Sequence, residues 1–318
     1  MQGKKEEPKW AVETKNLTRS FGKNLRAVDR LNLSIKRGEI FALLGPNGAG
    51  KTTTIKMLCC LLQPSSGNAT VMGNDISRSP RAVKKLINMS PQETAVAPNL
   101  TARENLILMG RIYGLNHEQA RGRAEDLLQT VELGARSREA VKRFSGGMLR
   151  RLSLAMALIS DPRVLFLDEP TTGLDARSRK SLWELIEFYR GRKTIVMTTH
   201  YLEEADFLAD RLAIINQGRL VALGTSEELK RELAGLETMT IQAENLTPTA
   251  AERLKKIYPR IRLNGEKLII EGEKLDFDTV VDCLRGEGVR IKWLSMKEPS
   301  LDEIYLKITE GGPIDESA

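Results

Sequence analysis

A glycine-rich stretch of eight residues restricts the fold more than any other feature of the sequence. It reads Gly45-Pro46-Asn47-Gly48-Ala49-Gly50-Lys51-Thr52. The residues before it, Ile40–Leu44, are all apolar, as in a strand buried on both faces of a parallel sheet. Residues 52–62 have a helical pattern, which we expect to end at the breakers in residues 63–67. A strand, a tight loop and a helix in this order predict the first unit of an α/β fold.

The glycines of this stretch are the residues that a phosphate-binding loop requires. They let backbone N–H groups close around phosphate oxygens at the N-terminus of the following helix. In this pattern Lys51 holds the β and γ phosphates, Thr52 ligates Mg²⁺, and Thr53 also lies among the binding residues. A flexible glycine-rich turn is the alternative, but it leaves the flanking strand and helix unexplained. We therefore predict that the chain binds a nucleotide.

Further strands and helices extend the α/β pattern. Leu31, Leu33 and Ile35 alternate as in a strand, and a short turn then leads to Ile40. Residues 100–161 have only helical patterns, which predicts a helical insertion between two strands. Other predicted strands are residues 86–90, Val164–Asp168 and Thr194–Thr199, followed by a hairpin of residues 212–215 and 220–223. The predicted fold class is therefore α/β, a phosphate-loop nucleotide-binding fold with a mostly parallel sheet, antiparallel β elements and a helical insertion.

Two acidic residues, Asp168 and Glu169, end the apolar strand Val164–Asp168. In open α/β sheets the carboxyl ends of strands border the ligand site. We expect Asp168 to contribute to the Mg²⁺ shell and Glu169 to polarise the attacking water as a general base. Two acids facing solvent at a strand end would be the alternative without a phosphate loop.

The pattern changes beyond about residue 235 and predicts a second domain. Strand 238–242, helix 249–258, a hairpin across Asn264-Gly265, helix 277–285 and strand 289–294 follow in the order of a small α+β ferredoxin-like unit. We place the first domain at residues 9–234, with its helical subdomain at about 93–162, and the accessory domain at 237–310. A last helix is expected from Ser300, with Glu303 completing a capping box, before a frayed tail at 311–318.

Composition excludes some classes of protein and leaves others open. The 318 residues include no apolar run of the roughly 18 to 20 that span a bilayer, and the N-terminal residues do not resemble a signal peptide. We expect a cytoplasmic location. The three cysteines are expected to be reduced packing residues, with Cys59 and Cys60 inside a helix. The net charge of +7 is compatible with nucleic acid, but scattered Lys and Arg without interleaved aromatics favour a solvated basic surface. No nucleic-acid partner is expected.

A longer series of motifs resembles the ATPases of ABC transporters. Phe144-Ser145-Gly146-Gly147-Met148 is similar to the signature loop of that family, and Gly173-Leu174-Asp175 to its aspartate loop. Gln92 resembles the glutamine lid, His200 the switch histidine and Phe21 the aromatic that stacks on adenine. The matches occur in family order from Phe21 to His200 and are more specific together than any one of them.

The resemblance implies a role for each residue. Ser145, Gly146 and Gly147 would face the γ-phosphate bound to the opposite subunit of a homodimer that forms on ATP binding. Gln92 and His200 would join Glu169 in catalysis, with Gln92 also near the metal and Asp175 near the nucleotide.

Each of these residues has a structural alternative. Ser-Gly-Gly alone is more often a turn with a helix cap, Gln92 a polar loop residue, His200 a structural histidine and Phe21 a core residue.

Met148 departs from the usual signature, which has glutamine there, and the effect on dimer affinity is open. Residues 100–106 and 199–205 resemble the daunorubicin-resistance and sodium-extrusion branch, in which this methionine and a small C-terminal domain are familiar. An exporter is therefore favoured over an importer by analogy. The resemblance also implies separate integral-membrane permease subunits, with this chain peripheral on the inner face of the cell membrane.

Three other classes of protein fit the sequence less well. A DNA-repair ABC protein would have long heptad runs, and a translation factor two phosphate loops, whereas this sequence has one such loop and no visible heptads. A non-hydrolysing switch is disfavoured by Glu169 and His200. The transported molecule stays open among drug, lipid, ion and polysaccharide, and so does the role of the accessory domain, since a passive cap over the ATPase domain is nearly as plausible as a docking module.

Overall fold

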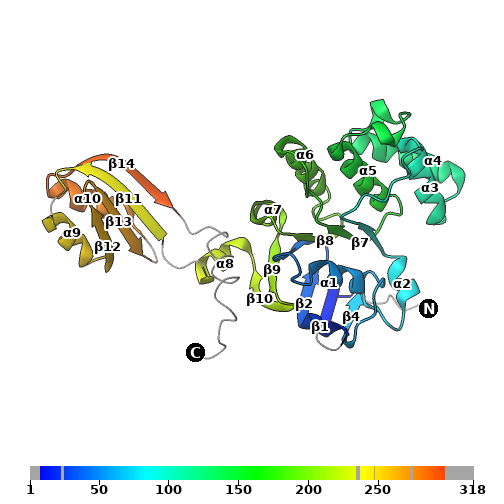
Figure 1. Cartoon of the computed structure of the whole chain (residues 1–318), viewed down its shortest axis with the longest axis horizontal. Coiled ribbons are helices and arrows are strands. Elements are labelled where there is room, and N and C mark those ends of the chain that lie inside the picture. Colours follow the sequence, from blue (N-terminus) through cyan, green and yellow to red (C-terminus); the bar gives the residue numbers. More distant parts are fainter. Residues whose placement is uncertain (1–7, 23–24, 234–236, 247, 273–274, 298–318) are drawn as a thin grey trace, which may run out of the picture. The chain divides into compact units, whose positions relative to one another are not determined.

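The structure is a computed structural model that describes residues 8–22, 25–233, 237–246, 248–272 and 275–297. The chain divides into two compact units between Ser226 and Glu227 (Figure 1). Helix α8 (Ser226–Leu233) occupies the stretch after this division. The domain boundaries at 234 and 237 therefore stay a prediction. Within the described residues, no helix combines the length and the apolar character needed to span a membrane.

A six-stranded sheet forms the centre of the first unit. Its order is β10 (Arg219–Gly224), β9 (Arg211–Asn216), β3 (Ile40–Leu44), β8 (Thr194–Thr199), β7 (Val164–Asp168) and β6 (Ile87–Ser90). Strands β9, β3, β8, β7 and β6 run parallel, and β10 closes the sheet as an antiparallel hairpin with β9. The predicted parallel sheet and its closing hairpin are confirmed. Helices α2 (Pro80–Lys84), α6 (Ala176–Glu187) and α7 (Leu202–Leu208) belong to the same unit.

A second, antiparallel sheet of the first unit has the order β2-β1-β4-β5. Its strands are β1 (Trp10–Phe21), β2 (Leu25–Lys36), β4 (Ser66–Val71) and β5 (Asn74–Asp75). The strand predicted from Leu31, Leu33 and Ile35 exists as part of β2, and it belongs to this sheet and not to the parallel one.

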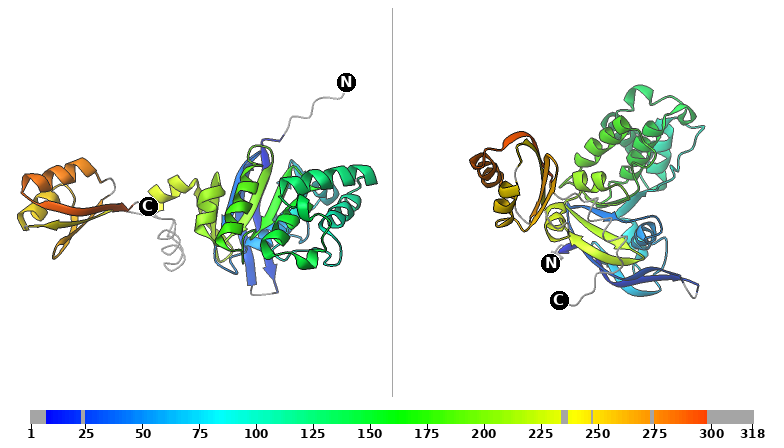
Figure 2. Two further views of the ribbon diagram at one scale, coloured as in Figure 1. Left: turned by 90° about the horizontal axis from the view of Figure 1, so that it is seen from above. Right: turned by 60° about the vertical axis from the view of Figure 1, so that its left-hand side comes forward.

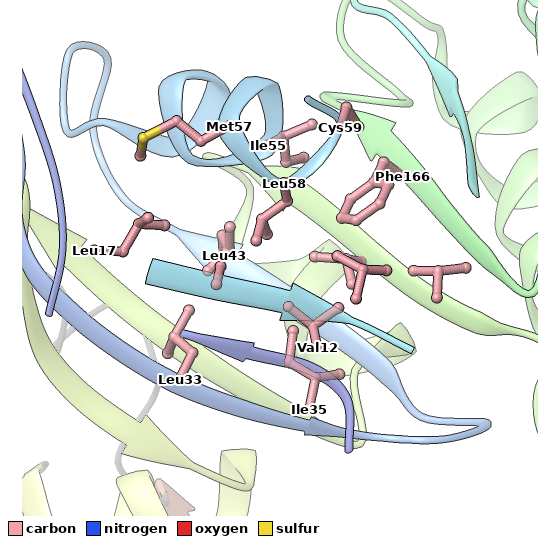
Figure 3. Close-up of a cluster of buried hydrophobic side chains, with 14 of the residues drawn as sticks. Val12, Leu17, Leu33, Ile35, Leu43, Ile55, Met57, Leu58, Cys59 and Phe166 are labelled. Carbon is pink, nitrogen blue, oxygen red and sulfur yellow. The ribbon is translucent and has the colours of Figure 1, made fainter. Parts of the chain in front are cut away.

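Helix α1 (Lys51–Leu58) contributes to a core that both sheets share. Figure 3 shows Ile55 and Leu58 of α1 beside Phe166 of β7, with Val12 of β1 and Ile35 of β2 below them. All five side chains are almost completely buried. Truncating one such residue typically costs 2–5 kcal/mol. The phosphate loop therefore precedes a helix that is anchored in this core.

The predicted end of α1 is wrong. The helix stops at Leu58, Cys59 is its C-terminal cap, and Cys60 has the left-handed backbone angle φ of 55°. Both cysteines therefore follow the helix and do not lie inside it. Cys59 still packs into the core, so the apolar pattern continues past the point where the helical backbone ends. The cysteines are free, and burial raises the pKa of the Cys59 thiol well above its ordinary value.

The helical insertion is confirmed between β6 and β7. It consists of α3 (Ala102–Ile112), α4 (His117–Thr130) and α5 (Gly146–Leu158), with short 3₁₀ turns at Gly134–Arg136 and Val141–Arg143. Capping boxes start two of the helices, one from Thr101 with Glu104 and one from Asn116 with Gln119. Both views of Figure 2 place these green helices together on one side of the parallel sheet.

The second unit has the predicted ferredoxin-like order of strands and helices. Its elements are β11 (Glu237–Glu244), α9 (Pro248–Lys255), β12 (Arg260–Asn264), β13 (Lys267–Gly272), α10 (Phe277–Gly286) and β14 (Arg290–Lys297). The antiparallel sheet has the order β12-β13-β11-β14, and α9 and α10 lie side by side on one face (Figure 1). Met239, Ile241 and Ile270 face these helices in a separate core. The helix predicted from Ser300 and the tail at 311–318 lie outside the described residues.

Candidate active site

The glycine-rich loop between β3 and α1 has the backbone that its sequence predicts. Gly50 caps α1 with a φ of 102°, a conformation that side chains oppose. A Cβ atom at Gly50 would lie 2.2 Å from the carbonyl oxygen of Ala27, and one at Gly45 would lie 2.3 Å from that of Ile215. These two glycines are needed because neighbouring backbone approaches so closely. The loop thus presents the unpaired N–H groups of the first turn of α1, which favour an anion.

Lys51 is buried in this loop. Its Nζ donates to the carbonyl oxygens of Gly45, at 2.7 Å, and Pro46, at 3.1 Å. Burial lowers the pKa of the Lys51 ammonium, and the nearby Glu169 carboxylate opposes that shift. The ammonium is therefore held in place by carbonyl groups of the loop itself.

Glu169 follows β7, and the other predicted catalytic residues contact its carboxylate. Its Oε2 accepts from Gln92 Nε2 at 3.0 Å and from Thr172 Oγ1 at 3.1 Å. Its Oε1 lies 3.6 Å from Lys51 Nζ and 3.4 Å from His200 Nδ1. Four residues from distant segments, Lys51, Gln92, Glu169 and His200, thus converge at the carboxyl edge of the parallel sheet.

The backbone of Glu169 is itself unusual, since its φ is 46°. A left-handed backbone is rare for residues other than glycine and is stored at functional sites when the surroundings hold it. The Glu169 N–H donates to Thr198 Oγ1 at 3.0 Å. This geometry turns the carboxylate away from the line of the strand and toward Lys51.

Asp168 and Thr52 provide two hard oxygen atoms beside the loop. Asp168 Oδ1 accepts from Thr52 Oγ1 at 2.9 Å and from Thr198 Oγ1 at 2.6 Å. Mg²⁺ is usually held by one or two such protein oxygens together with water and substrate phosphate. His200 Nδ1 is buried and makes no hydrogen bond within the described part of the chain. The oxygens, the buried ammonium and this unused nitrogen fit a magnesium nucleotide.

Ser145 caps helix α5, where its side chain accepts from the Met148 N–H at 3.3 Å. Asp175 caps α6 by accepting from the Ser178 N–H at 2.9 Å, and this hydrogen bond holds the pKa of the carboxyl below its ordinary range. A Cβ at Gly147 would lie 2.7 Å from Ser178 Oγ. The signature-like loop and the aspartate loop are therefore adjacent, at the N-termini of two packed helices.

Phe21 lies at the end of β1 with 40% of its surface exposed. The Arg19 guanidinium stands 4.7 Å from the centre of its ring. The structural alternative of a core residue is therefore excluded for Phe21.

Sequence reasoning missed Thr198, Thr172 and Arg150. Thr198 interrupts the apolar pattern of β8, and this polar residue within a buried strand was the available signal. Arg150 gave no local signal, because its partners belong to two loops that are remote in sequence. Thr172 lies only three residues after its partner Glu169, and this short spacing was the available signal.

Comparison with known proteins decides the family. The sequence profile of the ABC transporter family matches residues 28–172. The daunorubicin resistance ATP-binding protein DrrA2 of Streptomyces coeruleorubidus is 40% identical over 311 residues, 94% of this chain and 95% of that protein. The chain belongs to the ATP-binding proteins of the ABC transporter family. As such it binds and hydrolyses ATP.

Two further similarities support this ABC protein's fold and family. The linearmycin resistance ATP-binding protein LnrL of Bacillus subtilis (strain 168) is 36% identical over 305 residues, 94% of this chain and 98% of that protein. The ATP-binding cassette MJ0796, solved as a dimer with ADP and Pi, has a TM-score of 0.61 and 27% identity, covering 67% of this chain and 98% of the cassette.

Proposed function

We propose that this ABC protein powers the export of a drug-like molecule through a separate integral-membrane permease. The observation that carries the proposal is the convergence of Lys51, Gln92, Glu169 and His200 at one sheet edge. Relatives named for daunorubicin and linearmycin resistance support an antibiotic-type cargo. In this role the chain sits peripherally on the inner face of the cell membrane.

The reaction begins with ATP on the phosphate loop. Backbone N–H groups of the phosphate loop and of the first turn of α1 bind the phosphates together with the Lys51 ammonium, and Phe21 stacks on adenine. Thr52 and Asp168 would hold Mg²⁺, and Gln92 would be a further ligand or neighbour of the metal. When bound there, Mg²⁺ supplies a positive charge that offsets the charge developing on the phosphate oxygens.

Hydrolysis needs a water molecule aligned with the γ-phosphate. Glu169 takes a proton from this water as general base, and Gln92 orients it. His200 donates a hydrogen bond to the γ-phosphate. Before this proton transfer, the phosphate binds the Lys51 ammonium. The Glu169 carboxylate therefore loses its contact with Lys51 and contacts the water instead.

A second subunit completes the site in this proposal. Helix α1 packs against β2, β4 and β7, whereas α5 packs against α3, α4, α6 and β6. The phosphate loop and Ser145 stand at the N-termini of two different helices, which favours delivery of Ser145, Gly146 and Gly147 to the ATP of a partner related by a two-fold axis. Asp175 lies beside that loop and would join the same interface.

The test is the oligomeric state of Glu169→Gln. Losing a general base slows a reaction by about 10² to 10⁴, while the neutral amide keeps the shape needed for binding. We expect this variant to elute as a dimer with MgATP and as a monomer with ADP in size-exclusion chromatography.

The control is the same protein with Ser145→Arg added. The longer side chain should abolish the shift to dimer while ATP still binds the phosphate loop. A Glu169→Gln protein that stays monomeric in saturating MgATP, both with Met148→Gln and with its copurified permease, contradicts the composite site.

A further inference from the structure

One buried arginine makes an unusual set of contacts next to the active site. Arg150 of α5 is 6% exposed. Each of its five N–H groups has one backbone carbonyl oxygen as acceptor, at distances from 2.5 to 2.9 Å. These acceptors belong to Pro91, Gln92, Asp168, Glu169 and Pro170.

The five carbonyls come from two loops that carry the chemistry. Nη1 binds Pro91 and Gln92, which follow β6, and Nη2 with Nε binds the three residues 168–170 at the end of β7. Strands β6 and β7 are neighbours in the parallel sheet. One guanidinium therefore fastens both loops to the helix that Ser145 caps.

This contact also completes the support of the strained residue. The Glu169 N–H is held by Thr198 Oγ1, and the Glu169 carbonyl is held by Arg150 Nη2. Both peptide groups that flank the left-handed backbone are thus fixed by side chains from other segments. Such a conformation persists only when its surroundings hold it.

Only arginine has the donors for this arrangement. Its planar fork presents five N–H groups in fixed directions, whereas lysine has three on a flexible stem. Burial of a charged group is costly, and burial lowers the pKa of Arg150, while Asp168, Glu204 and Glu169 oppose that shift. Packing alone does not require a buried charge here, since a buried ion can often be replaced by apolar residues without loss of stability.

We infer that Arg150 is a positioning residue that aims Glu169 and Gln92 at the attacking water by holding their backbone carbonyls to helix α5. The inference rests on the roles proposed above for Glu169 and Gln92. Arg150 does not touch the nucleotide, so its loss should lower kcat and spare ATP affinity. A misplacement of about 1 Å is enough to cost on the order of 10²-fold in rate.

The first experiment compares Arg150→Met, Arg150→Lys and the control Arg151→Met. Arg151 is next in the same helix, and its guanidinium binds Glu132 Oε2 at 2.9 Å, away from both loops. For Arg150→Met we expect kcat to fall by about 10- to 100-fold with the dissociation constant for ATP changed by less than about threefold. Arg150→Lys should recover part of the rate, and Arg151→Met should match the wild type.

A double-mutant cycle separates positioning from general damage. If Arg150 acts through Glu169, adding Arg150→Met to Glu169→Gln should lower the single-turnover rate by no more than about threefold. Should Arg150→Met not fold, the same cycle with Arg150→Lys decides. The inference is overturned if Arg150→Met lowers the rate as much in the Glu169→Gln background as in the wild type. It is also overturned if folded Arg150→Met has an unchanged kcat. Wild-type turnover in Glu169→Gln alone would instead overturn the proposed base, which is a different outcome.

Discussion

The Lys51 ammonium and the Glu169 carboxylate lie 3.6 Å apart, and both side chains are buried. The structure thus holds the cation that we propose binds phosphate against the proposed general base. A buried charge that loses its partner is costly, so phosphate binding to Lys51 must be accompanied by new contacts for Glu169. Gln92 and Thr172, which already donate to Oε2, are placed to keep the carboxylate satisfied during that exchange.

Lys51→Ala should abolish tight MgATP binding, because it removes the charge opposite the β and γ phosphates. Hydrogen bonds to charged groups contribute about 1.5–3 kcal/mol, so we expect the affinity to fall by at least about tenfold in isothermal titration calorimetry. Lys56→Ala is the matched control, since Lys56 is exposed on the same helix. Equal affinity in the two variants would contradict the assignment.

Thr198→Val should both slow turnover and lower the free energy of unfolding. The hydroxyl donates to Asp168 Oδ1 and accepts from the Glu169 N–H, so valine removes one hydrogen bond from each acidic residue. We expect about tenfold lower kcat and about 1–3 kcal/mol less stability, measured by steady-state ATPase assay and urea unfolding. Thr198→Ser keeps the hydroxyl and should retain most of the rate. A serine variant as slow as the valine variant would argue that packing, and not the hydroxyl, matters.

The stability of the ATPase unit should depend on the protonation of Glu204. Burial raises the pKa of this carboxyl above its ordinary value of 4.5, and Trp183 Nε1 donates to Oε1 at 3.1 Å. Between pH 4.5 and the pKa of the folded state, the folded protein binds more protons than the unfolded chain. The protonated carboxyl therefore contributes stability at low pH, and this contribution is lost as pH rises through that interval. Glu204→Gln cannot lose a proton, and its stability relative to the wild type should therefore increase with pH.

Thermal unfolding of wild type and Glu204→Gln from pH 4 to 8 tests the sign. Glu203→Gln makes the same change on the exposed neighbouring side chain and should follow the wild type at each pH. The role is ruled out if the unfolding temperature of Glu204→Gln minus that of the wild type stays constant or falls as pH rises.

The C-terminal unit should fold and melt by itself. Its core, from Met239 to Leu294, has no member in common with the core that supports the phosphate loop. A chain ending at Leu233 should bind ATP within about threefold of the full protein, while transport with the permease is strongly reduced. Loss of ATP binding in a truncated chain that still shows cooperative unfolding would place the boundary elsewhere.

The glycine-rich loop, the strands and the chain order of the second unit were predictable because each depends on neighbours in sequence. Periodicity failed where a tertiary contact replaced a local one. Helix α1 ends at Leu58 because the chain turns through a left-handed Cys60, while Cys59 keeps an apolar side chain in the core. Residues 31–35 were recognised as a strand, but their sheet depends on pairing with β1, which no local pattern specifies.

The sequence by itself was enough to predict nucleotide binding on a loop at Gly45 to Thr52, since that chemistry needs glycines, a lysine and a hydroxyl in a fixed local order. It also indicated Glu169 and His200 as candidate catalytic residues at strand ends. Only the tertiary structure decided how they act together. Arg150 and Thr198 fix Glu169 through hydrogen bonds to its backbone, and those bonds exist because parallel strands bring distant segments to one edge. Backbone carbonyls are the same in every residue, so a sequence cannot record which side chain will bind them.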